Sequence, residues 1–553
     1  MPLGALFLVA SAVRLYRLDW SLPYTYEEAT PLHVAWDMWG WDRERGVNLN
    51  PEYFNYPSLT FYVQFVAQGL LYLAMKVAGR VRELSDWFVM YYTDPTPLYV
   101  TARLVNALFG AATAVVVYRG AARVGGRVAA GVAFVLIAWN SFHVTRSQMI
   151  EVDVPLTFFT ALALYGSAGV ATTGRRRDTV LAGVATGLAL SCKYTGALLL
   201  VPLLVAHVLR RKAAPRVRVA GFAVSSALAM LAFAVTSPFV ILDAIEAAKG
   251  IAVEREHMAL GHFGADARAT WLYYATLLLG KVVSIPVAVA ALGGIILFAV
   301  FRRDRSALVL GSFVAAYLVV VCSWAMKADR YLLPLVPPLS VLAAVFAGAV
   351  LKRLRESPRV LPARVLSVAV LVAVLAPGFV RYVSEVRSFQ QDPRTEAREW
   401  IDANVPGGAY VVTEFYGPEF IGPDFLMSMN PALRKRVIDR VGTQHIYAKQ
   451  LLPMFQTQSE RSAPFYSLAL YENADLFIVS TGVASRYRRE PGRFGPQLAF
   501  YRDLEQRMSI AKDFKPTRAG DVRVTIYNAV QLPAYSADAR QRVRGELDLP
   551  ADA

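Results

Sequence analysis

Cysteine and charge are both scarce in this chain of 553 residues. The two cysteines, Cys192 and Cys322, stand inside apolar runs, so they cannot build a disulfide framework or a cysteine-based metal site. Charged residues make up 18%, against about 25% in an average soluble protein, and apolar residues reach 55%. This composition excludes intrinsic disorder and collagen. With a mean hydropathy of +0.37, it predicts an integral membrane protein.

The net charge of +16 is concentrated in the first two-thirds of the chain. From residue 385 onward, 22 basic residues nearly balance 21 acidic ones. Nucleic-acid binding would need basic residues on one folded face beside aromatic side chains, and this pattern argues against it. Basic residues flanking apolar runs are typical of cytoplasmic loops, because translocating Lys and Arg is disfavoured. Five such clusters occur: Arg119/Arg123/Arg127, Arg175–Arg177, Arg210–Lys212 with Arg216 and Arg218, Arg302/Arg303/Arg305, and Lys352/Arg353/Arg355 with Arg359 and Arg364.

The apolar runs predict an α-helical polytopic bundle of about eleven transmembrane helices, since one span needs about 20 residues. With the basic clusters inside, the N-terminus is cytoplasmic, and everything after residue 381 is extracytoplasmic. The start of the chain lacks a basic region and a clear cleavage site, so we expect a retained first helix. The predicted spans are 2–20, 98–118, 127–146, 153–171, 179–192, 195–210, 218–237, 281–300, 306–326, 332–350 and 362–381.

Three other regions are expected outside the membrane. The apolar run Leu59–Met75 would break the parity of the spans, so we interpret it as an interfacial helix within a long first outer loop, 21–97. A second outer loop covers about 238–280. Residues 385–553 are predicted to form an extracytoplasmic α/β domain, separate from a membrane domain at 1–384. Its expected elements are helices at 395–404 and 500–508 and strands at 410–415, 475–480 and 522–528.

Carboxylates occur at two places predicted to face the outer surface. Glu27 and Glu28 follow the first span among aromatic residues, where desolvation and mutual repulsion shift a pKa toward that of a general base. A solvated loop or a helix cap explains the same pair. Asp153 opens a span directly before Val154 and Pro155, where an acid also favours the helix dipole. Two acidic centres on one side, distant in sequence, make a catalytic site a stronger hypothesis than either alone.

Three cations are expected in the outer half of the same bundle: Lys193, Arg330 and Arg103. A lone Lys near a helix end usually extends its ammonium toward the membrane surface. Three converging cations would instead bind a lipid phosphate, because Arg matches phosphate oxygens in geometry. The residues leave both interpretations open.

Histidines supply further candidates but no metal site. His143, His257 and His262 are all predicted to be external, and none forms a pair with the spacing of a helical metal site. We therefore favour hydrogen bonding or substrate contact for them. The sequence shows no ligand set for a divalent cation.

Several short motifs, in order along nearly the whole chain, are similar to blocks of the C-type polytopic glycosyltransferases of family 39. This group includes protein O-mannosyltransferases and the aminoarabinose transferases of lipid A. Besides Glu27-Glu28, the similar segments are Asn55-Tyr56-Pro57-Ser58-Leu59, Ala102-Arg103-Leu104, Phe142-His143-Val144, Asp153-Val154-Pro155-Leu156, Lys193-Tyr194-Thr195-Gly196, Ser237-Pro238-Phe239, Gly261-His262-Phe263-Gly264, Arg330-Tyr331-Leu332-Leu333-Pro334 and Trp400-Ile401 with Asn404-Val405-Pro406-Gly407.

The resemblance implies an inverting transfer of a sugar from a polyprenyl-phosphate donor to an acceptor hydroxyl, on the outer face of a cell membrane. It implies that Glu27, Glu28 and Asp153 carry the catalytic carboxylates. Lys193, Arg330 and Arg103 would bind the lipid phosphate. The substrate-contact candidates are Tyr56, His143, Tyr194 and His262. The acceptor would be a glycan, a lipid or a protein, and the surrounding membrane lipids would be the other partners.

The sequence departs from the family pattern at two positions. The family's first acid is Asp, whereas Glu27 stands here, and one extra methylene moves the carboxylate by about one ångström, enough to affect rate. The lipid A branch carries a phosphate-binding Lys in the element that here reads Tyr56-Pro57. Because this chain lacks that Lys, the sequence gives less support to an aminoarabinose transferase.

Two other functional classes fit a polytopic chain. A transporter or flippase would need ionisable residues near the bilayer midplane and paired broken helices. A non-catalytic scaffold would need only the outer domain. The position of the notable charges at one membrane surface favours the enzyme.

Overall fold

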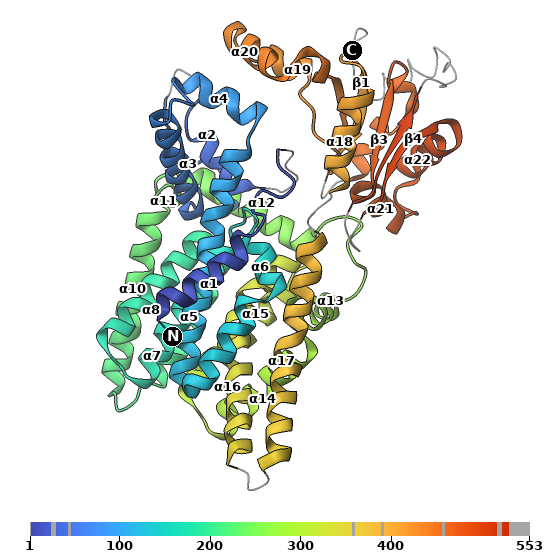
Figure 1. Ribbon diagram of the computed structural model, residues 1–553. Coiled ribbons are helices and arrows are strands. Elements are labelled where there is room, and N and C mark those ends of the chain that lie inside the picture. The colour runs from blue at the N-terminus through green and yellow to red at the C-terminus, as the bar shows by residue number, and fades with distance from the viewer. Residues whose placement is uncertain are drawn as a thin grey trace.

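A computed structural model describes residues 2–23, 29–41, 46–356, 360–388, 392–455, 459–516 and 522–529. A long helical bundle carries a small mixed sheet at one end, which we term the sheet end (Figure 1). The bundle contains α1 (Leu3–Leu15), α5 (Thr96–Ala138), α6 (Ser141–Ser147), α7 (Asp153–Thr172), α8 (Arg176–Cys192), η1 (Tyr194–Leu199), α9 (Leu200–Val208), α10 (Pro215–Thr236), α14 (Ile285–Gly294), η3 (Ile295–Phe301), α15 (Arg305–Ser323), η4 (Asp329–Leu335), α16 (Val336–Arg355) and α17 (Val360–Ser388).

Among the described residues, six helices are long and apolar enough to cross a membrane. They become seven if the pair Thr270–Val282 and Ile285–Phe301, bent by 108°, is counted as one span. The predicted number of eleven is therefore wrong by this measure. Three predicted spans are too short as helices (α1, α8 and η1 with α9), and two others count as one helix, α5, which is broken at Gly126.

Helix α5 is interrupted at Gly126, whose φ of 77° lies in a region that only glycine adopts readily. The segment that follows α5 lies beside the part of α5 before this break. The Asn106 side chain donates to the Met149 carbonyl at 2.7 Å, and a Cβ on Gly110 would lie 2.2 Å from the Ser147 hydroxyl. The chain thus reverses at Gly126, and the segment after α5 returns to the sheet end.

Shorter helices cover the sheet end of the bundle (Figure 1). The helix predicted at Leu59–Met75 exists as α3, with two residues more than expected at its end. Loop 238–280, predicted as an outer loop, contains three helices. These surface elements are α2 (Thr30–Asp37), α3 (Leu59–Val77), α4 (Leu84–Thr93), α11 (Phe239–Leu242), α12 (Ala244–Leu260), α13 (Thr270–Leu277) and η2 (Leu278–Val282).

The C-terminal α/β region contains five strands in the order β2-β1-β3-β5-β4. Strands β1, β2 and β3 are parallel, while β5 is antiparallel to both β3 and β4. The region is built from α18 (Pro393–Asn404), β1 (Tyr410–Glu414), α19 (Pro423–Met427), α20 (Pro431–Val441), η5 (Thr443–His445), β2 (Ala448–Leu452), η6 (Ser459–Phe465), η7 (Leu468–Tyr471), β3 (Leu476–Ser480), α21 (Thr481–Arg489), α22 (Gly495–Arg507), β4 (Ser509–Phe514) and β5 (Val524–Asn528).

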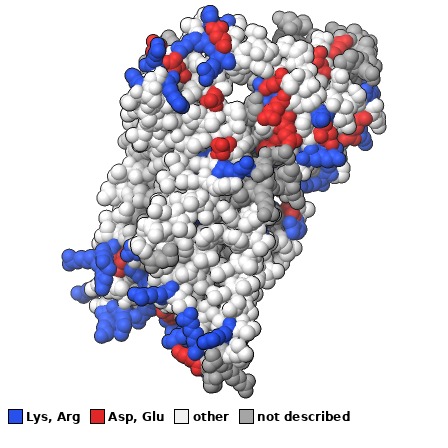
Figure 2. Space-filling model, viewed as in Figure 1, with Lys and Arg blue, Asp and Glu red and all other residues white. Residues whose placement is uncertain are grey.

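Charge separates the two ends of the bundle. Lys and Arg gather at the end opposite the sheet, and a broad belt without charges covers the middle of the face shown (Figure 2). Contacts bring three predicted basic clusters together there. Arg123 lies 3.5 Å from Asp178, and Arg210 donates to the Gly174 carbonyl at 2.7 Å. An uncharged belt between two charged ends is the pattern expected of a multi-pass membrane protein.

The core of the α/β region contains a buried carboxyl group, Glu414, at the end of β1. It accepts hydrogen bonds from the Ser480 backbone amide, at 2.7 Å, and from the Tyr501 hydroxyl. Burial raises the pKa of Glu414 to about 8. The folded state therefore keeps this proton at pH values where the unfolded chain has already released it, and stability falls as pH rises from about 4.5 to about 8.

We expect Glu414→Gln to remove this pH dependence, because the amide keeps the shape without a titrating proton. The measurement is the melting temperature of the detergent-solubilised full chain between pH 5 and pH 8. The wild type should lose stability across this window and the variant should not. An equal slope in both proteins would contradict the assignment.

Candidate functional site

A buried ion pair lies at the sheet end of the bundle, where α7 begins and α8 ends. The Lys193 ammonium donates to Asp153 at 2.9 Å (Oδ1) and 3.2 Å (Oδ2). Only 5% of Lys193 and 1% of Asp153 is exposed. A buried charge pair is costly to maintain, which makes it a candidate for function.

Local backbone geometry directs Lys193 into the bundle. Helix α8 ends at Cys192, Lys193 is extended (φ −158°, ψ 140°), and the short 3-10 helix η1 follows at once. The chain turns tightly against α8 here, because a Cβ on Gly196 would lie 2.4 Å from the Ala189 carbonyl carbon. The predicted bend around Lys193 is therefore present, and it aims the side chain at the first residue of α7.

A second cation and two aromatic rings complete the cluster. Arg330 Nε lies 3.9 Å from Asp153 Oδ2. The Lys193 ammonium lies 4.4 Å from the Tyr331 ring centroid and 5.5 Å from that of Tyr56, within the range of cation–π attraction. Burial raises the pKa of Tyr56 well above its ordinary value, so its phenol stays a hydrogen-bond donor.

This cluster opens into a cavity of about 440 Å³ with a largely apolar lining. Lys193, Tyr56 and Tyr331 line one part of it, and α12 contributes Glu254 and Arg255. The remaining lining residues are Asn55, Tyr194, Thr195, Ile251, Met258, Ala259, Ser323 and Trp324. An apolar pocket with a few charged groups at one place suits an amphiphilic ligand with an anionic head. Two of the substrate-contact candidates, Tyr56 and Tyr194, thus lie in this cavity.

Helix α12 forms a wall of the cavity while making few buried contacts of its own. Ala247 is its only buried residue. The start of the helix is fixed by Asn50, which donates to the carboxylate of Asp243, the residue before α12, at 2.9 Å. Its last turn is held by the Met258 carbonyl, which accepts from the backbone amides of Ala325 and Met326 at 3.1 and 3.2 Å. Sequence reasoning missed α12, although the run Glu254-Arg255-Glu256-His257 could have marked it.

A second ionic network supports the turn that carries Arg330. Arg146 bridges Glu151, at 2.6 Å, and Asp329, at 2.5 Å, and Asp329 also binds Lys281 at 2.5 Å. Burial raises the pKa of Glu151, opposed by the nearby Arg146 guanidinium. The network joins α6, the start of α7, η2 and η4. Because no spacing in the sequence relates Arg146 to Lys281, it was not predicted.

Three predicted site residues lie elsewhere or cannot be placed. Glu27 and Glu28 fall outside the described residues. Arg103 donates to the carbonyls of Leu18 and Trp20 at 2.9 and 2.8 Å, so its described contacts are with the segment after α1 and not with Lys193.

The predicted contact residue His143 is completely buried beside Arg14. The Arg14 guanidinium lies 2.9 Å from His143 Nδ1. Burial and this guanidinium hold the pKa of His143 well below its ordinary value. The neutral ring therefore accepts a hydrogen bond within the bundle, and it does not line the cavity.

The fourth contact candidate, His262, links the cavity wall to the C-terminal α/β region. Its Nε2 lies 2.6 Å from His257 Nε2, on the last turn of α12. The next residue, Phe263, is 5% exposed and packs against Tyr487 and Phe494, with ring centroids 5.0 and 5.4 Å away. Among the described residues, no three His, Cys, Asp or Glu side chains converge to hold a metal ion.

Solved structures share this architecture over almost the whole chain. ArnT from Cupriavidus metallidurans in the apo state aligns with a TM-score of 0.53 at 16% identity, covering 96% of this chain and 99% of that one. The same protein bound to undecaprenyl phosphate gives 0.51 at 17% identity. The archaeal oligosaccharyltransferase AglB from Archaeoglobus fulgidus gives 0.53 at 11%, covering 96% of this chain and 74% of AglB.

The chain has the fold of the polytopic C-type glycosyltransferases. The resemblance inferred from its motifs is thereby confirmed, together with the predicted fold class of a helical membrane bundle with a C-terminal α/β region. In sequence, residues 67–247 match the family described as dolichyl-phosphate-mannose-protein mannosyltransferase. That segment of the GT-C fold includes both Asp153 and Lys193.

A curated relative matches over a shorter stretch. Dolichyl-phosphate-mannose–protein mannosyltransferase 1 of Candida albicans is 38% identical over 112 residues. The match covers 19% of this chain and 12% of that relative. Most of the Candida protein therefore has no counterpart in the alignment.

Proposed function

We propose that the chain is an inverting glycosyltransferase that moves a sugar from a polyprenyl-phosphate donor to an acceptor hydroxyl. The observation that carries this proposal is the buried cluster of Asp153, Lys193 and Arg330, whose Lys193 lines an apolar cavity at the sheet end of a GT-C fold. The family match at 67–247 and the fold shared with ArnT, solved with undecaprenyl phosphate bound, support it.

The charges of the cluster suit a phosphate. Lys193 and Arg330 carry two positive charges against the single negative charge of Asp153, so the cluster has a net charge of +1. The phosphate of the donor would lie against these cations, and the first isoprene units would occupy the apolar part of the cavity. As the sugar leaves, negative charge grows on the phosphate, and fixed cations in a dry site stabilise it strongly.

Asp153 fits a positioning role better than that of a base. Both of its oxygens accept hydrogen bonds from Lys193, which aims the ammonium at the cavity. The base would be Glu27, with Glu28 as the alternative. Its carboxylate takes the proton of the acceptor hydroxyl as the oxygen bonds to the anomeric carbon. The bond from that carbon to the phosphate oxygen breaks in the same step, its electron pair leaves with the phosphate, and configuration inverts.

The proposal includes an orientation in the membrane. The basic clusters would face the cytoplasm together with the N-terminus, in the plasma or inner membrane. Residues 1–384 would form the catalytic membrane domain, and 385–553 an extracytoplasmic domain. The opposite placement of the basic loops and the Asp153–Lys193 pair along α7 and α8 supports this arrangement.

The test is sugar transfer by the purified full-length protein from a synthetic polyprenyl-phosphate hexose. We expect Glu27→Gln to lower kcat by about 100-fold or more, the usual loss when a general base is removed. If Glu27→Gln lowers kcat only slightly, a large loss of kcat in Glu28→Gln would identify Glu28 as the base. NMR of the product should show the anomeric configuration opposite to that of the donor.

A matched control is Glu246→Gln, which removes an exposed carboxylate on α12 whose partner is Lys249. We expect it to be neutral, because exposed ion pairs contribute little. Undiminished transfer by Glu27→Gln, Asp153→Asn and Lys193→Ala alike would refute the proposed site. Retention of anomeric configuration would refute the single-step mechanism.

A further inference from the structure

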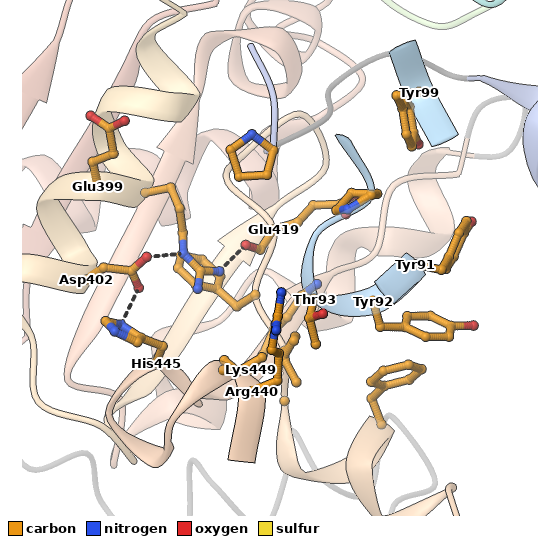
Figure 3. Close-up of a pocket in the computed structure, with 18 of the residues that line it drawn as sticks. Tyr91, Tyr92, Thr93, Tyr99, Glu399, Asp402, Glu419, Arg440, His445 and Lys449 are labelled. Carbon is orange, nitrogen blue, oxygen red and sulfur yellow. Dashed lines mark hydrogen bonds and ion pairs between the residues drawn. The ribbon is translucent and has the colours of Figure 1, made fainter. Parts of the chain in front are cut away.

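A larger cavity, of about 990 Å³, lies between the short helices of the first outer loop and the C-terminal α/β region (Figure 3). One wall carries Tyr91, Tyr92 and Tyr99, and the facing wall carries charged side chains of the α/β region. Its volume is near the upper end of the range of about 300–1,000 Å³ for ligand pockets, which is room for more than one sugar ring. No step of the proposed reaction involves this cavity.

The aromatic wall is held rigidly. The two ring nitrogens of His33 lie 2.6 Å from the Tyr91 hydroxyl and 3.2 Å from the Tyr99 hydroxyl. Burial lowers the pKa of His33 to about 4, so a neutral ring donates one of these bonds and accepts the other. Tyr91 also stacks on Trp36, with centroids 4.0 Å apart and planes at 7°. A preorganised aromatic surface binds a ligand without a large entropy cost.

Contacts at the margins keep the two walls apart at a fixed spacing. The Tyr92 and Phe425 rings meet at 4.8 Å, and Arg436 forms an ion pair with Asp86. On another side, the Ser21 and Thr395 hydroxyls lie 3.2 Å apart. Figure 2 shows an opening between these two parts of the molecule, with acidic side chains along its edge. The cavity is therefore built into the junction and open to solvent.

The polar wall carries hydrogen-bond donors and acceptors that are available to a ligand. Arg398 already has partners within the protein, because it donates to Asp402 at 2.9 Å and to the Glu419 carbonyl. In the described part of the chain, Glu399, Arg440 and Lys449 line the cavity without a hydrogen bond or ion pair. Figure 3 shows Arg440 and Lys449 next to each other and Glu399 farther along the same wall.

We propose that this cavity binds the acceptor, and that the acceptor is an uncharged glycan. The inference rests on the proposed function and adds the acceptor class to it. Four carboxylates and three Lys or Arg side chains line the cavity, so it has no excess of positive charge to select an anionic ligand. Sugar hydroxyls need donors and acceptors together, which Arg440, Lys449 and Glu399 supply. The apolar faces of sugar rings pack against flat aromatic rings, which Tyr91 and Tyr92 supply.

The test measures binding of neutral trisaccharides to the purified full chain in a sugar-free detergent. The probes are mannotriose, maltotriose and cellotriose, with a Ser/Thr-rich peptide for comparison, and binding is followed by saturation-transfer NMR. We expect at least one trisaccharide to bind. The triple variant Glu399→Gln/Arg440→Gln/Lys449→Gln should weaken it by about tenfold or more, because charged hydrogen-bond partners are lost. Tyr92→Leu should weaken it separately.

The control variant is Lys435→Gln/Asp439→Asn, an exposed ion pair on α20 that does not line the cavity. It should bind as the wild type does. If the cavity variants bind trisaccharides as tightly as the wild type does, the inference is overturned. It is also overturned if the Ser/Thr-rich peptide binds the wild type and the same variants abolish that binding.

Two results separate this inference from the proposed function. If no trisaccharide binds but the donor sugar is transferred to the peptide, the glycan assignment falls and the glycosyltransferase stands. If trisaccharides bind in the cavity but no acceptor receives sugar, the glycan site stands and the proposed reaction falls.

Discussion

Lys193→Ala should abolish most sugar transfer and also destabilise the protein. Among the described residues, the variant leaves the buried Asp153 carboxylate with Arg330, at 3.9 Å, as its remaining ion-pair partner. Removing one partner of a buried ion pair costs about 3–5 kcal/mol. The loss of a fixed cation beside the leaving phosphate should lower kcat by about 100-fold or more. Both effects are measurable, as the melting temperature in detergent and as transfer from a polyprenyl-phosphate hexose.

The double variant Lys193→Ala/Asp153→Asn separates these two effects. A neutral amide at position 153 no longer needs a cation, so the melting temperature should recover toward that of the wild type. Transfer should not recover, because the phosphate still lacks its ammonium. Lys249→Ala, which removes an exposed Lys paired with Glu246, is the matched control and should change neither quantity. Full activity in the double variant would show that Lys193 serves folding alone.

Phe263→Ala should disconnect α12 from the C-terminal α/β region. This ring is buried in the aromatic core of that region, and its neighbour Gly264 is bound from both sides. Gly264 donates its amide to Glu490 at 2.5 Å and accepts from Arg489 at 2.7 Å. Truncating a buried Phe costs about 3–5 kcal/mol, which should lower the melting temperature by about 5 °C or more. Because α12 lines the donor cavity, KM for the donor should rise as well.

Phe415→Ala provides the control, since Phe415 belongs to the same region but is 46% exposed. Its melting temperature and KM should match the wild type. Phe263→Leu should restore most of both quantities, because Leu refills much of the apolar space. Unchanged donor KM in Phe263→Ala, together with a lowered melting temperature, would show that the ring stabilises the junction without acting on the cavity.

Features of the fold that depend on local pattern were predictable from the sequence. The strand expected at 410–415 is Tyr410–Glu414, the one at 475–480 is Leu476–Ser480, and the helix at 395–404 is Pro393–Asn404. Strand β2, Ala448–Leu452, was missed because it lies at the edge of the sheet and lacks an alternating apolar pattern. The number of spans was wrong because α1, α8 and η1 with α9 are shorter than a full crossing, and because α5 counts as one helix across its break at Gly126.

The candidate site was predictable in its location and only partly in its contacts. The order of spans placed Asp153, Lys193 and Arg330 at one end of the bundle, and the structure brings these three together. The same reasoning included Arg103, whose described contacts are backbone carbonyls after α1. Span order decides which end a residue occupies, whereas helix rotation decides what its side chain meets. The apolar residues of α5 do not reveal that rotation, because they occupy both buried positions (Ala102, Ala107) and exposed ones (Leu104, Leu108).

The weak attachment of α12 has a consequence for how a long-chain donor enters and leaves. This helix buries only Ala247 and is fastened at its two ends, by Asn50 at one and by the Met258 carbonyl at the other. The middle of α12 rests on Phe54, because a Cβ on Gly250 would lie 2.8 Å from the Phe54 Cβ, so releasing the two amides that hold Met258 would loosen only the end of the helix that borders the cavity. Exchange of spent carrier for fresh carrier would then proceed sideways from the lipid phase, at a rate set by fraying of one helix end.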